Sequence, residues 1–470
     1  MAQTANPKTE EVHKLEVVRH QGKLMVPDTM DLKDVDKCLH EQMEYEDKVV
    51  VISEVIEVFP WDGAVSFQKA MEEEFGWVRQ EVTPSFFGDQ PPELRAVEVG
   101  QGVTKNVAWG RFSLPGLSGW VGTAASMKDG RLVFAVQAQT KRKYEPLIRR
   151  LVARTRELLK TESIYRGKAI SIQFTDEHGD ALDAQEITPR FLDLSGVDED
   201  SLVYNKDVGA AIDASLFVPI DRADDVIREL GSWKRGVLLH GKFGTGKTLA
   251  AFVAAKKAVA AGITFILARN PQDFAEVVRF AVPYSKAVIF AEDIDRLMTG
   301  TRTLAMDQIL NIIDGIESKG QELMIVLTSN RVDKVQEAAL RPGRLDAVIN
   351  VEPPNRETVE ILLRKVAGSL IVAEEDLGQI CTILEGQNPA VIKESVKKAK
   401  LAAIRNVPRG AKITRLTEFD LIVAAKSMAD QIRLLAGESE EKEDPGTLLA
   451  RAAAVETAKL VLPKVKKLLE

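Results

Sequence analysis

A glycine-rich octapeptide in the middle of the chain has the residue types and spacing of a phosphate-binding loop. GKFGTGKT, residues 241–248, fits the pattern G-x-x-x-x-G-K-[ST]. Its glycines let the backbone curl so that N–H groups point at phosphate oxygens, and the helix that follows adds partial positive charge. Lys247 would reach the β and γ phosphates, and the Thr248 hydroxyl would ligate magnesium. The residues expected to bind a nucleotide here are Gly241, Lys242, Phe243, Gly244, Thr245, Gly246, Lys247, Thr248 and Leu249.

Two adjacent carboxylates, Glu292 and Asp293, follow the apolar run AVIFA, 45 residues after Lys247. In phosphate-loop ATPases a strand-end acid pair holds magnesium and polarises the attacking water, and its usual order is Asp then Glu. We expect Glu292 to hold magnesium, directly or through water, and Asp293 to act on the attacking water. If the general base needs the longer side chain, the two residues exchange these duties. In the simpler alternative, both carboxylates only cap the next helix.

A third set of polar residues follows another apolar run. LMIVLTSN ends at Asn330, whose side chain could orient a water beside the γ phosphate. Further along the chain, Arg341 and Arg344 flank a Pro-Gly turn. The order of acid pair, Asn and Arg pair favours both arginines as fingers that reach a neighbouring subunit's nucleotide and stabilise transition-state charge. As an alternative, the two arginines are ordinary surface charges.

These residues need a sheet to position them, and the apolar runs predict one. From about residue 205, short strands alternate with helical segments, which is typical of a parallel sheet covered by helices on both faces. The phosphate-binding loop lies between a strand and a helix that starts at Leu249. After residue 356 the pattern predicts helices only. The expected strands are GVLLH, TFILA, AVIFA, LMIVLTSN and AVINVEPP.

The residues before this sheet have a different composition. KVVVISEVIEVF favours a strand, Asp62 could cap a helix, and Lys-Asp-Gly at 128–130 predicts a hairpin turn. The amphipathic segment YEPLIRRLVARTRELLK and the strand AISIQF complete an α+β domain. Turn-forming and acidic residues between 176 and 205 mark its boundary. The predicted units are a polar arm at 1–48, this α+β domain for partner or substrate recognition at 49–185, a nucleotide-binding α/β subdomain at 186–352, a helical lid at 353–436, and a charged linker with a final helix at 437–470.

Seven basic residues gather on and just before the amphipathic segment. They could bind a nucleic acid or an acidic partner. Alternatively they form the solvated face of one helix, because Leu147, Ile148, Leu151 and Val152 make an apolar stripe opposite them. The basic residues are Lys141, Arg142, Lys143, Arg149, Arg150, Arg154 and Arg156.

Charge and composition limit the class of protein. The 470 residues carry a formal net charge of −7, with 45% hydrophobic and 28% charged residues, as in an ordinary globular protein. An acidic total argues against a protein that coats nucleic acid. Cys38 and Cys381 lie far apart, without the spacing of a zinc site or a disulfide framework. With no secretory signal and no apolar run long enough to span a bilayer, we expect a cytoplasmic protein.

Together these motifs resemble those of the AAA family of ATPases over residues 205–435. The resemblance adds a lid motif in LEGQNPAVIKESVKKA, where Gly386, Pro389 and Ala390 hold the places that present the family's lid to the nucleotide. Pro389 and Ala390 would then contribute to nucleotide binding. The resemblance implies a phosphate-loop α/β core with a parallel sheet and an all-helical lid, ATP and Mg²⁺ as ligands, and ATP hydrolysis. It also implies a ring, commonly of six subunits, with active sites shared between neighbours.

The chain departs from the family pattern at two places. Lys242 and Phe243 replace two usual prolines, whose side chains are not needed for phosphate contacts. Only 18 residues, 269–286, separate TFILA from AVIFA, and PQDFAEVVRFAVPYS uses most of them as one helix beginning at Pro271. Little remains for the aromatic-hydrophobic pore loop of polypeptide-threading members, which argues against an unfoldase. This short segment and the Glu-Asp order resemble the branch that includes the mitochondrial translocase of the folded Rieske protein.

Three functions follow from these patterns. The first is an ATP-hydrolysing ring motor that remodels or moves a macromolecular partner, a protein rather than a nucleic acid, without a membrane span. The second is a nucleotide-gated assembly scaffold with little turnover, against which Asn330, Arg341 and Arg344 count. The third is a nucleic-acid-associated motor or loader, supported only by the basic residues at 141–156.

Overall fold

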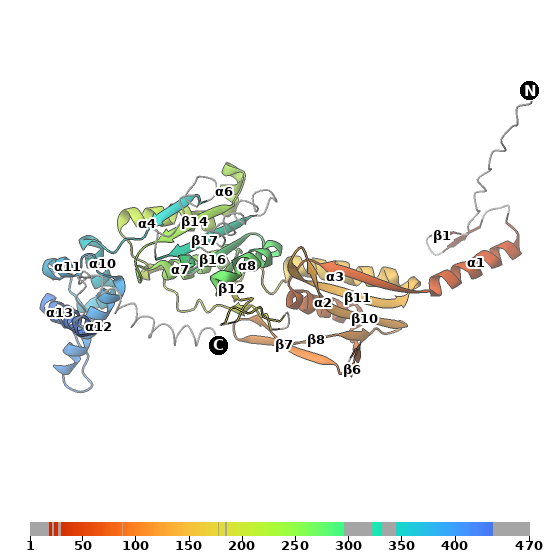
Figure 1. Cartoon of the computed structure of the whole chain (residues 1–470), viewed down its shortest axis with the longest axis horizontal. Coiled ribbons are helices and arrows are strands. Elements are labelled where there is room, and N and C mark those ends of the chain that lie inside the picture. Colours follow the sequence, from red (N-terminus) through yellow and green to blue (C-terminus); the bar gives the residue numbers. More distant parts are fainter. Residues whose placement is uncertain are drawn as a thin grey trace, which may run out of the picture. The chain divides into compact units, whose positions relative to one another are not determined.

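The structure, a computed structural model, describes residues 18–20, 23–26, 30–86, 88–176, 178–183, 186–295, 322–330 and 345–435. The chain divides into two compact units, whose elements are coloured along the sequence in Figure 1. The first unit comprises residues up to 161. The second begins at 162 and also takes in 96–105 and 127–132.

The first unit is built on a five-stranded sheet with the strand order β3-β11-β10-β9-β4. β3 (Val49–Ile56) pairs antiparallel with β11 (Arg131–Lys141). β10 (Gly119–Lys128) and β11 form the predicted hairpin. Asp129 and Gly130 between them have φ angles of 51° and 70°, the left-handed conformations that a two-residue type I′ turn needs.

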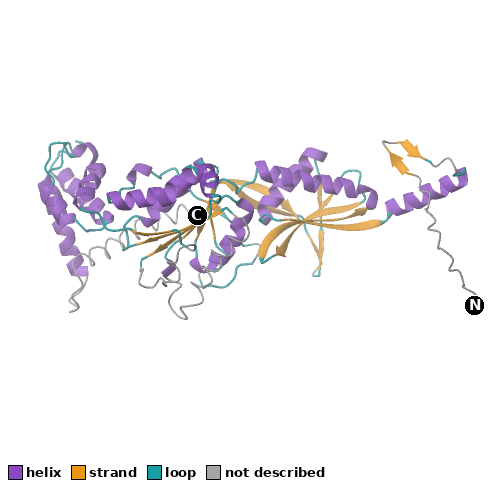
Figure 2. Ribbon diagram, turned by 90° about the horizontal axis from the view of Figure 1, so that it is seen from above, coloured by secondary structure: helices purple, strands orange, loops and turns teal. Residues whose placement is uncertain are grey.

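Two helices, α2 (Pro60–Phe75) and α3 (Glu145–Thr161), cover one face of this sheet (Figure 2). Three of the four residues of the predicted apolar stripe on α3 are buried, with Ile148, Leu151 and Val152 between 1% and 2% exposed, while Leu147 is half-buried. This stripe therefore forms part of the unit's core. The unit also contains β1 (Val18–His20), β2 (Lys23–Met25), α1 (Leu32–Asp47), β4 (Arg79–Glu81), β5 (Thr83–Ser85), β6 (Gly88–Gln90), β9 (Arg111–Ser113) and the short η1 (Arg142–Tyr144). β7 (Glu93–Gly100) and β8 (Val103–Trp109) are divided between the two units, because residues 96–105 belong to the second.

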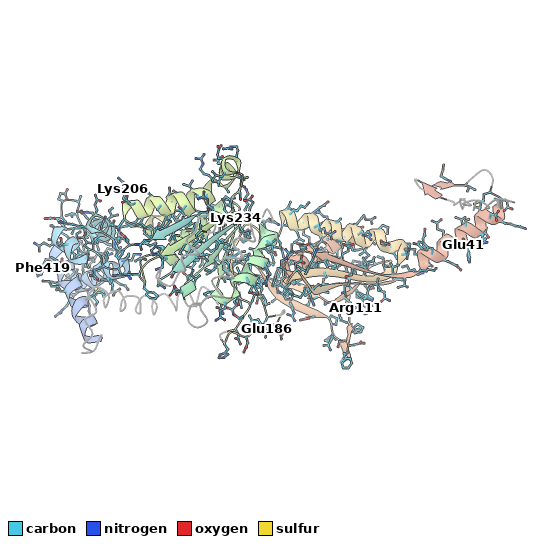
Figure 3. The ribbon with its side chains drawn as sticks, turned by 45° about the horizontal axis from the view of Figure 1, so that its top comes forward. Glu41, Arg111, Glu186, Lys206, Lys234 and Phe419 are labelled. Atoms are coloured by element: carbon cyan, nitrogen blue, oxygen red, sulfur yellow. The ribbon has the colours of Figure 1, made fainter. Side chains whose placement is uncertain are left out.

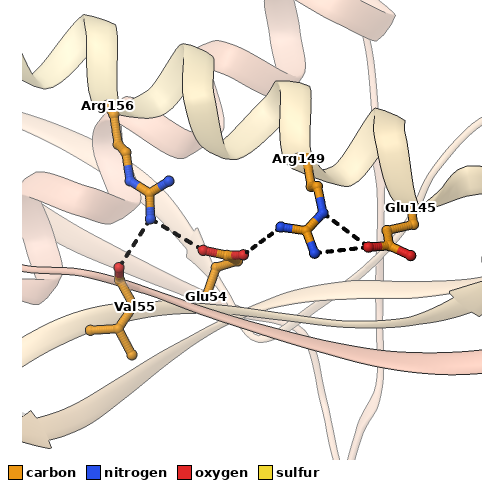
Figure 4. Close-up of polar contacts among 5 residues, drawn as sticks. All are labelled: Glu54, Val55, Glu145, Arg149 and Arg156. Carbon is orange, nitrogen blue, oxygen red and sulfur yellow. Dashed lines mark hydrogen bonds and ion pairs between the residues drawn. The ribbon is translucent and has the colours of Figure 1, made fainter.

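The basic side of α3 is neutralised by acidic residues of the same unit. Glu54 of β3 accepts hydrogen bonds from Arg149 at 3.3 Å and from Arg156 at 3.2 Å (Figure 4). This pairing favours the interpretation of these residues as the solvated face of one helix. Other ion pairs of the predicted basic cluster join Arg149 to Glu145, Lys141 and Lys143 to Asp47, Arg150 to Glu74, and Arg154 to Glu73 and Glu157.

The second unit is built on a seven-stranded sheet with the order β13-β12-β15-β16-β17-β14-β18, in which all strands except β13 run parallel. Every residue of β16 and β17 is buried, as expected of strands covered on both faces. The predicted α/β fold is confirmed. The strands are β12 (Ala169–Ile172), β13 (Arg190–Phe191), β14 (Arg235–His240), β15 (Thr264–Ala268), β16 (Ala287–Ala291), β17 (Leu323–Ser329) and β18 (Ala347–Asn350).

The second unit has two apolar cores. One surrounds the sheet and includes Trp233 and Phe290, and the other lies among the helices after residue 355 and includes Leu363 and Val396. No helix within the described ranges combines the length and the apolar composition needed to cross a bilayer. The helices are α4 (Lys206–Ile212), α5 (Val218–Asp221), α6 (Ala223–Leu230), α7 (Lys247–Ala260) and α8 (Phe274–Ala281), followed by α10 (Arg356–Ala367), α11 (Gly378–Leu384), α12 (Pro389–Arg405) and α13 (Glu418–Leu435) of the lid.

β12 corrects the predicted domain boundary. We assigned AISIQF to an α+β domain ending at residue 185, but β12 pairs in parallel with β15, and the second unit begins at Glu162. All four residues of β12 are buried. A short apolar run of this kind fits a strand of either sheet equally well, so only the pairing assigns it to the second unit.

The segment between β15 and β16 is as short and as helical as predicted. The turn η4 (Pro271–Asp273), α8 and the turn η5 (Val282–Tyr284) follow one another without a break. Residues 269–286 therefore contain no extended loop.

Candidate functional site

The predicted phosphate-binding loop joins the end of β14 to the start of α7. Gly241, Gly244 and Gly246 have φ angles of 153°, 73° and 101°, so the loop depends on glycine to curl. At Gly241 a Cβ atom would lie 2.4 Å from the carbonyl oxygen of Val351, which leaves no room for a side chain. α7 begins at Lys247, directly after the last glycine, so the unpaired N–H groups of its first turn adjoin the loop.

Lys247 is 6% exposed and lies against the loop backbone. Its Nζ donates to the carbonyl oxygens of Gly241 at 2.7 Å and Lys242 at 2.9 Å. Burial lowers the pKa of Lys247 to about 8, although nearby carboxylates, above all that of Asp293, oppose this shift. A desolvated ammonium group held by neutral carbonyl oxygens is suited to receive an anion such as a phosphate.

The two threonines of the loop have different surroundings. Thr245 is 2% exposed, and its hydroxyl donates to the Lys242 carbonyl oxygen at 3.0 Å, which closes the turn. Thr248, in the first turn of α7, is exposed, so its side chain is accessible to a ligand. Phe243 is 54% exposed and Leu249 is half-buried.

Glu292 and Asp293 directly follow β16, and Asn330 directly follows β17. The registers place the ends of these strands level with the end of β14 in one parallel sheet. Asp293 has a φ of 50°, an uncommon conformation for a residue other than glycine, and its N–H donates to the Thr328 hydroxyl at 3.0 Å. The carboxyl ends of three adjacent strands therefore gather the predicted loop, acid pair and amide.

Asn330 contacts two acids at once. Its side-chain Nδ2 donates to Oδ1 of Asp293 at 2.7 Å, and its backbone N–H donates to Oδ1 of Asp295 at 3.0 Å. The carboxylate of Asp295 also opposes the lowering of the pKa of Lys247. Asp295 is not among the predicted site residues, although its place two residues after Asp293 is a visible signal in the sequence.

The predicted lid contacts the loop through Asn388, which is not among the predicted site residues. Asn388 is 3% exposed, and its Nδ2 donates to the Phe243 carbonyl oxygen at 2.5 Å. Its Oδ1 accepts from the N–H of Ala390 and so caps α12, whose first residue is Pro389. An Asn before a Pro at a helix start is the local signal for this cap, and the nucleotide contacts of Pro389 and Ala390 stay predictions.

A second unpredicted contact comes from Tyr204. Its hydroxyl donates to the Gly246 carbonyl oxygen at 2.9 Å, and burial raises its pKa. Burial and the charge of Lys247 also lower the pKa of His240, the last residue of β14. No motif marks Tyr204 in the sequence, because its contact with the loop joins segments 42 residues apart.

Arg341 and Arg344 lie outside the described residues, so their role as fingers stays a prediction. Within the described part, the arrangement brings together a curled glycine-rich backbone, a buried ammonium group, the exposed Thr248, two half-buried acids, and an amide fixed against one of those acids. Such a set can hold a polyphosphate, offer oxygen ligands to Mg²⁺ and position a water.

Residues 237–353 match the model of the ATPase family associated with various cellular activities (AAA). The match includes the whole loop, the acid pair and Asn330. The chain therefore carries an AAA ATPase domain, in agreement with the α/β fold of its second unit.

Similar proteins include two whose names refer to the proteasome and one named as an ATPase. A proteasome-activating nucleotidase of Aeropyrum pernix is 31% identical over 258 residues, 49% of this chain and 61% of that protein. The 26S proteasome regulatory subunit 10B homolog A of Arabidopsis thaliana is 34% identical over 192 residues, 36% of this chain and 47% of that protein. ATPase family gene 2 protein of Saccharomyces cerevisiae is 31% identical over 43% of this chain and 29% of its own length. The chain thus covers less than two thirds of each of these relatives.

Proposed function

Because residues 237–353 form an AAA ATPase domain, we propose that this chain hydrolyses ATP as a ring motor that remodels or moves a protein partner. The observation that carries the proposal is the hydrogen bond between Asn330 and Asp293, at the sheet edge that also holds Lys247. A module that only bound nucleotide would need the loop and the lysine. It would not need an amide fixed against a strand-end acid.

The residues of the site divide the work as follows. Lys247 and the loop N–H groups hold the phosphates, and the Thr248 hydroxyl and the Glu292 carboxylate supply the oxygen ligands that Mg²⁺ prefers. When bound, Mg²⁺ neutralises charge on the transferred phosphoryl group. Asp293 accepts a proton from the attacking water, and the amide of Asn330 orients that water.

In the proposed ring, each active site is completed by the adjacent subunit. Arg341 and Arg344 reach the neighbour's nucleotide and stabilise charge in the transition state. Six subunits are the number that the AAA resemblance favours. Images of particles formed with ATP would show the subunit number, and monomers under those conditions would contradict a ring.

A protein partner is supported by the names of the proteasome-activating relatives. The helical segment at 269–286 argues against threading of that partner through a pore, because it contains no extended loop. The likeness to the Rieske-protein translocase branch rests on this segment and on the order of Glu292 and Asp293, and it favours movement of a folded partner. We assign partner recognition to the first unit, which lies outside the family match.

ATP turnover by the full chain tests the proposal against a nucleotide-gated scaffold. We expect Lys247→Ala to reduce turnover to background. Lys256→Ala is a matched control, because this lysine of α7 donates to the Val197 carbonyl oxygen, away from the loop, and its loss should leave turnover unchanged. If the parent hydrolyses ATP no faster than Lys247→Ala and still assembles on ATP, the scaffold replaces the motor.

A further inference from the structure

Tyr204 contacts the last residue of the phosphate-binding loop. Its Oη is 2.9 Å from the carbonyl oxygen of Gly246, and a Cβ atom on Gly246 would lie 3.4 Å from the tyrosine ring. Tyr204 is half-buried, and this carbonyl supplies the hydrogen-bond partner that its hydroxyl needs away from water. The position of Tyr204 therefore follows that of the loop end.

The next residue, Asn205, contacts a different part of the unit. Its Nδ2 donates to the Pro353 carbonyl oxygen at 3.0 Å, and its Oδ1 accepts from the N–H of Asn355 at 2.9 Å. Asn205 also precedes α4, which opens at Lys206 (Figure 3), yet its side chain makes no capping hydrogen bond to that helix. Asparagine at such a position commonly caps its own helix. Here the side chain is hydrogen-bonded to residues 353–355 instead.

Residues 351–355, called the hinge segment below, connect β18 to α10, the first helix of the predicted lid. Pro353 and Pro354 have fixed φ angles and no N–H, which limits the backbone freedom of this segment. Their carbonyl groups accept hydrogen bonds from other segments. The carbonyl of Pro354 accepts from the N–H of Gly386 in the lid at 3.0 Å. That of Pro353 accepts from Asn205. Pro354 is thus hydrogen-bonded to Gly386 of the predicted lid, and Pro353 to Asn205, the residue after Tyr204.

We infer that Tyr204 and Asn205 are positioning residues that couple the phosphate-binding loop to the hinge segment. The inference rests on the proposed function and names a regulatory link of that site. Because the two residues are adjacent, with Cα atoms ~3.8 Å apart, a shift of the Gly246 carbonyl displaces both side chains. Asn205 then moves residues 353–355, and α10 moves with them. The hydrogen bond from Asn388 to the Phe243 carbonyl oxygen links the lid to the loop a second time, so movement of the lid also displaces the loop.

The test measures lid movement in the full chain by energy transfer between two dyes. The dyes are attached at Leu230→Cys in α6 and Leu401→Cys in α12, whose side chains are 63% and 62% exposed. Cys38→Ser removes the half-buried thiol, and Cys381, which is 2% exposed, is retained. The probe is the non-hydrolysable analogue AMP-PNP with Mg²⁺ at saturating concentration.

Two variants each interrupt one contact. Tyr204→Phe removes the hydroxyl and keeps the ring, and Asn205→Ser keeps a side chain that can cap α4 but is too short for the hinge segment. We expect each variant to lose most of the nucleotide-driven change in energy transfer and to bind AMP-PNP about 2- to 10-fold more weakly. The double variant should lose no more than the larger single loss, because both contacts belong to one path. Asn270→Ser, a cap at η4 away from the loop, should move the lid like the parent.

The outcomes separate this inference from the proposed function. Full lid movement in either variant, additive losses, or a parent that binds AMP-PNP without lid movement would overturn the coupling and leave ATP hydrolysis standing. A parent that binds no more AMP-PNP than Lys247→Ala would overturn both. Asn205→Asp guards against misfolding, because it still accepts from the Asn355 N–H but cannot donate to Pro353. It should lose an intermediate share of the movement.

Discussion

Asn330 donates its side-chain amide to the carboxylate of Asp293 at 2.7 Å, across the ends of two neighbouring buried strands. Asp293 meets it with an uncommon backbone φ of 50°. The amide of Asn330 therefore contacts Asp293, the acid that we propose acts on the attacking water, and not Glu292.

Turnover of two isosteric variants will assign the general base. In Asp293→Asn the new amide oxygen can still accept from Asn330, so the geometry is retained while the base is lost. We expect turnover to fall by about 100- to 10,000-fold with ATP binding kept. Glu292→Gln should instead raise the Mg²⁺ concentration needed for turnover.

Asp295→Asn is the control for these variants, because its oxygen still accepts from the Asn330 N–H, and it should change turnover by less than about tenfold. Loss of turnover in Glu292→Gln with binding kept would move the base to Glu292. Turnover that survives in both Glu292→Gln and Asp293→Asn would exclude the mechanism.

Nucleotide binding should take up a proton above pH 8. The pKa of Lys247 is lowered from 10.5 to about 8, so the side chain of the free protein loses its charge as pH rises through that value. A bound polyphosphate favours the charged form and restores the proton, so affinity should fall with rising pH above about 8. Calorimetry at pH 9 in buffers of different ionisation enthalpy measures the uptake. Lys247→Met should show none, and equal uptake in that variant would place the titrating group elsewhere.

Gly244 and Asn388 should be energetically coupled. A Cβ atom on Gly244 would lie 2.1 Å from Nδ2 of Asn388, and the φ of 73° adds strain. We expect Gly244→Ala to lower the free energy of unfolding by roughly 1–3 kcal/mol. Asn388→Ser keeps a capping oxygen for α12 and makes room, so the double variant should recover part of the loss. Additive effects in thermal unfolding would show that the two residues do not touch.

The basic side of α3 should not bind DNA. Since Glu54 and its acidic neighbours neutralise the arginines, we expect affinity for duplex DNA weaker than the roughly 1–100 µM range of non-specific binders at physiological salt. Fluorescence anisotropy at several salt concentrations checks this. Joint replacement of Glu54, Glu73 and Glu74 by Gln is the matched gain-of-binding control. Salt-sensitive binding by the parent, or DNA-stimulated turnover, would instead support the nucleic-acid motor.

Local patterns predicted the parts of the site that are local in the chain. The loop, the acid pair and Asn330 each directly follow an apolar strand, and a strand end with polar residues is visible without knowledge of its neighbours. The short helical segment before β16 was also predictable, because the 18 residues between the two strands are contiguous in the sequence. The boundary near residue 185 was misplaced because the buried strand β12 has no pattern that distinguishes one sheet from another.

The sequence by itself predicted which side chains bring chemistry to this protein: Lys247 at the end of the phosphate-binding loop, and Glu292, Asp293 and Asn330 at strand ends. Only the tertiary structure decided their partners. Strand order set Asn330 against Asp293, and folding of distant segments brought Tyr204 to Gly246 and Asn388 to Phe243. Hydrogen bonds between residues far apart in the chain leave no periodicity in the sequence, because each partner satisfies only its own local pattern.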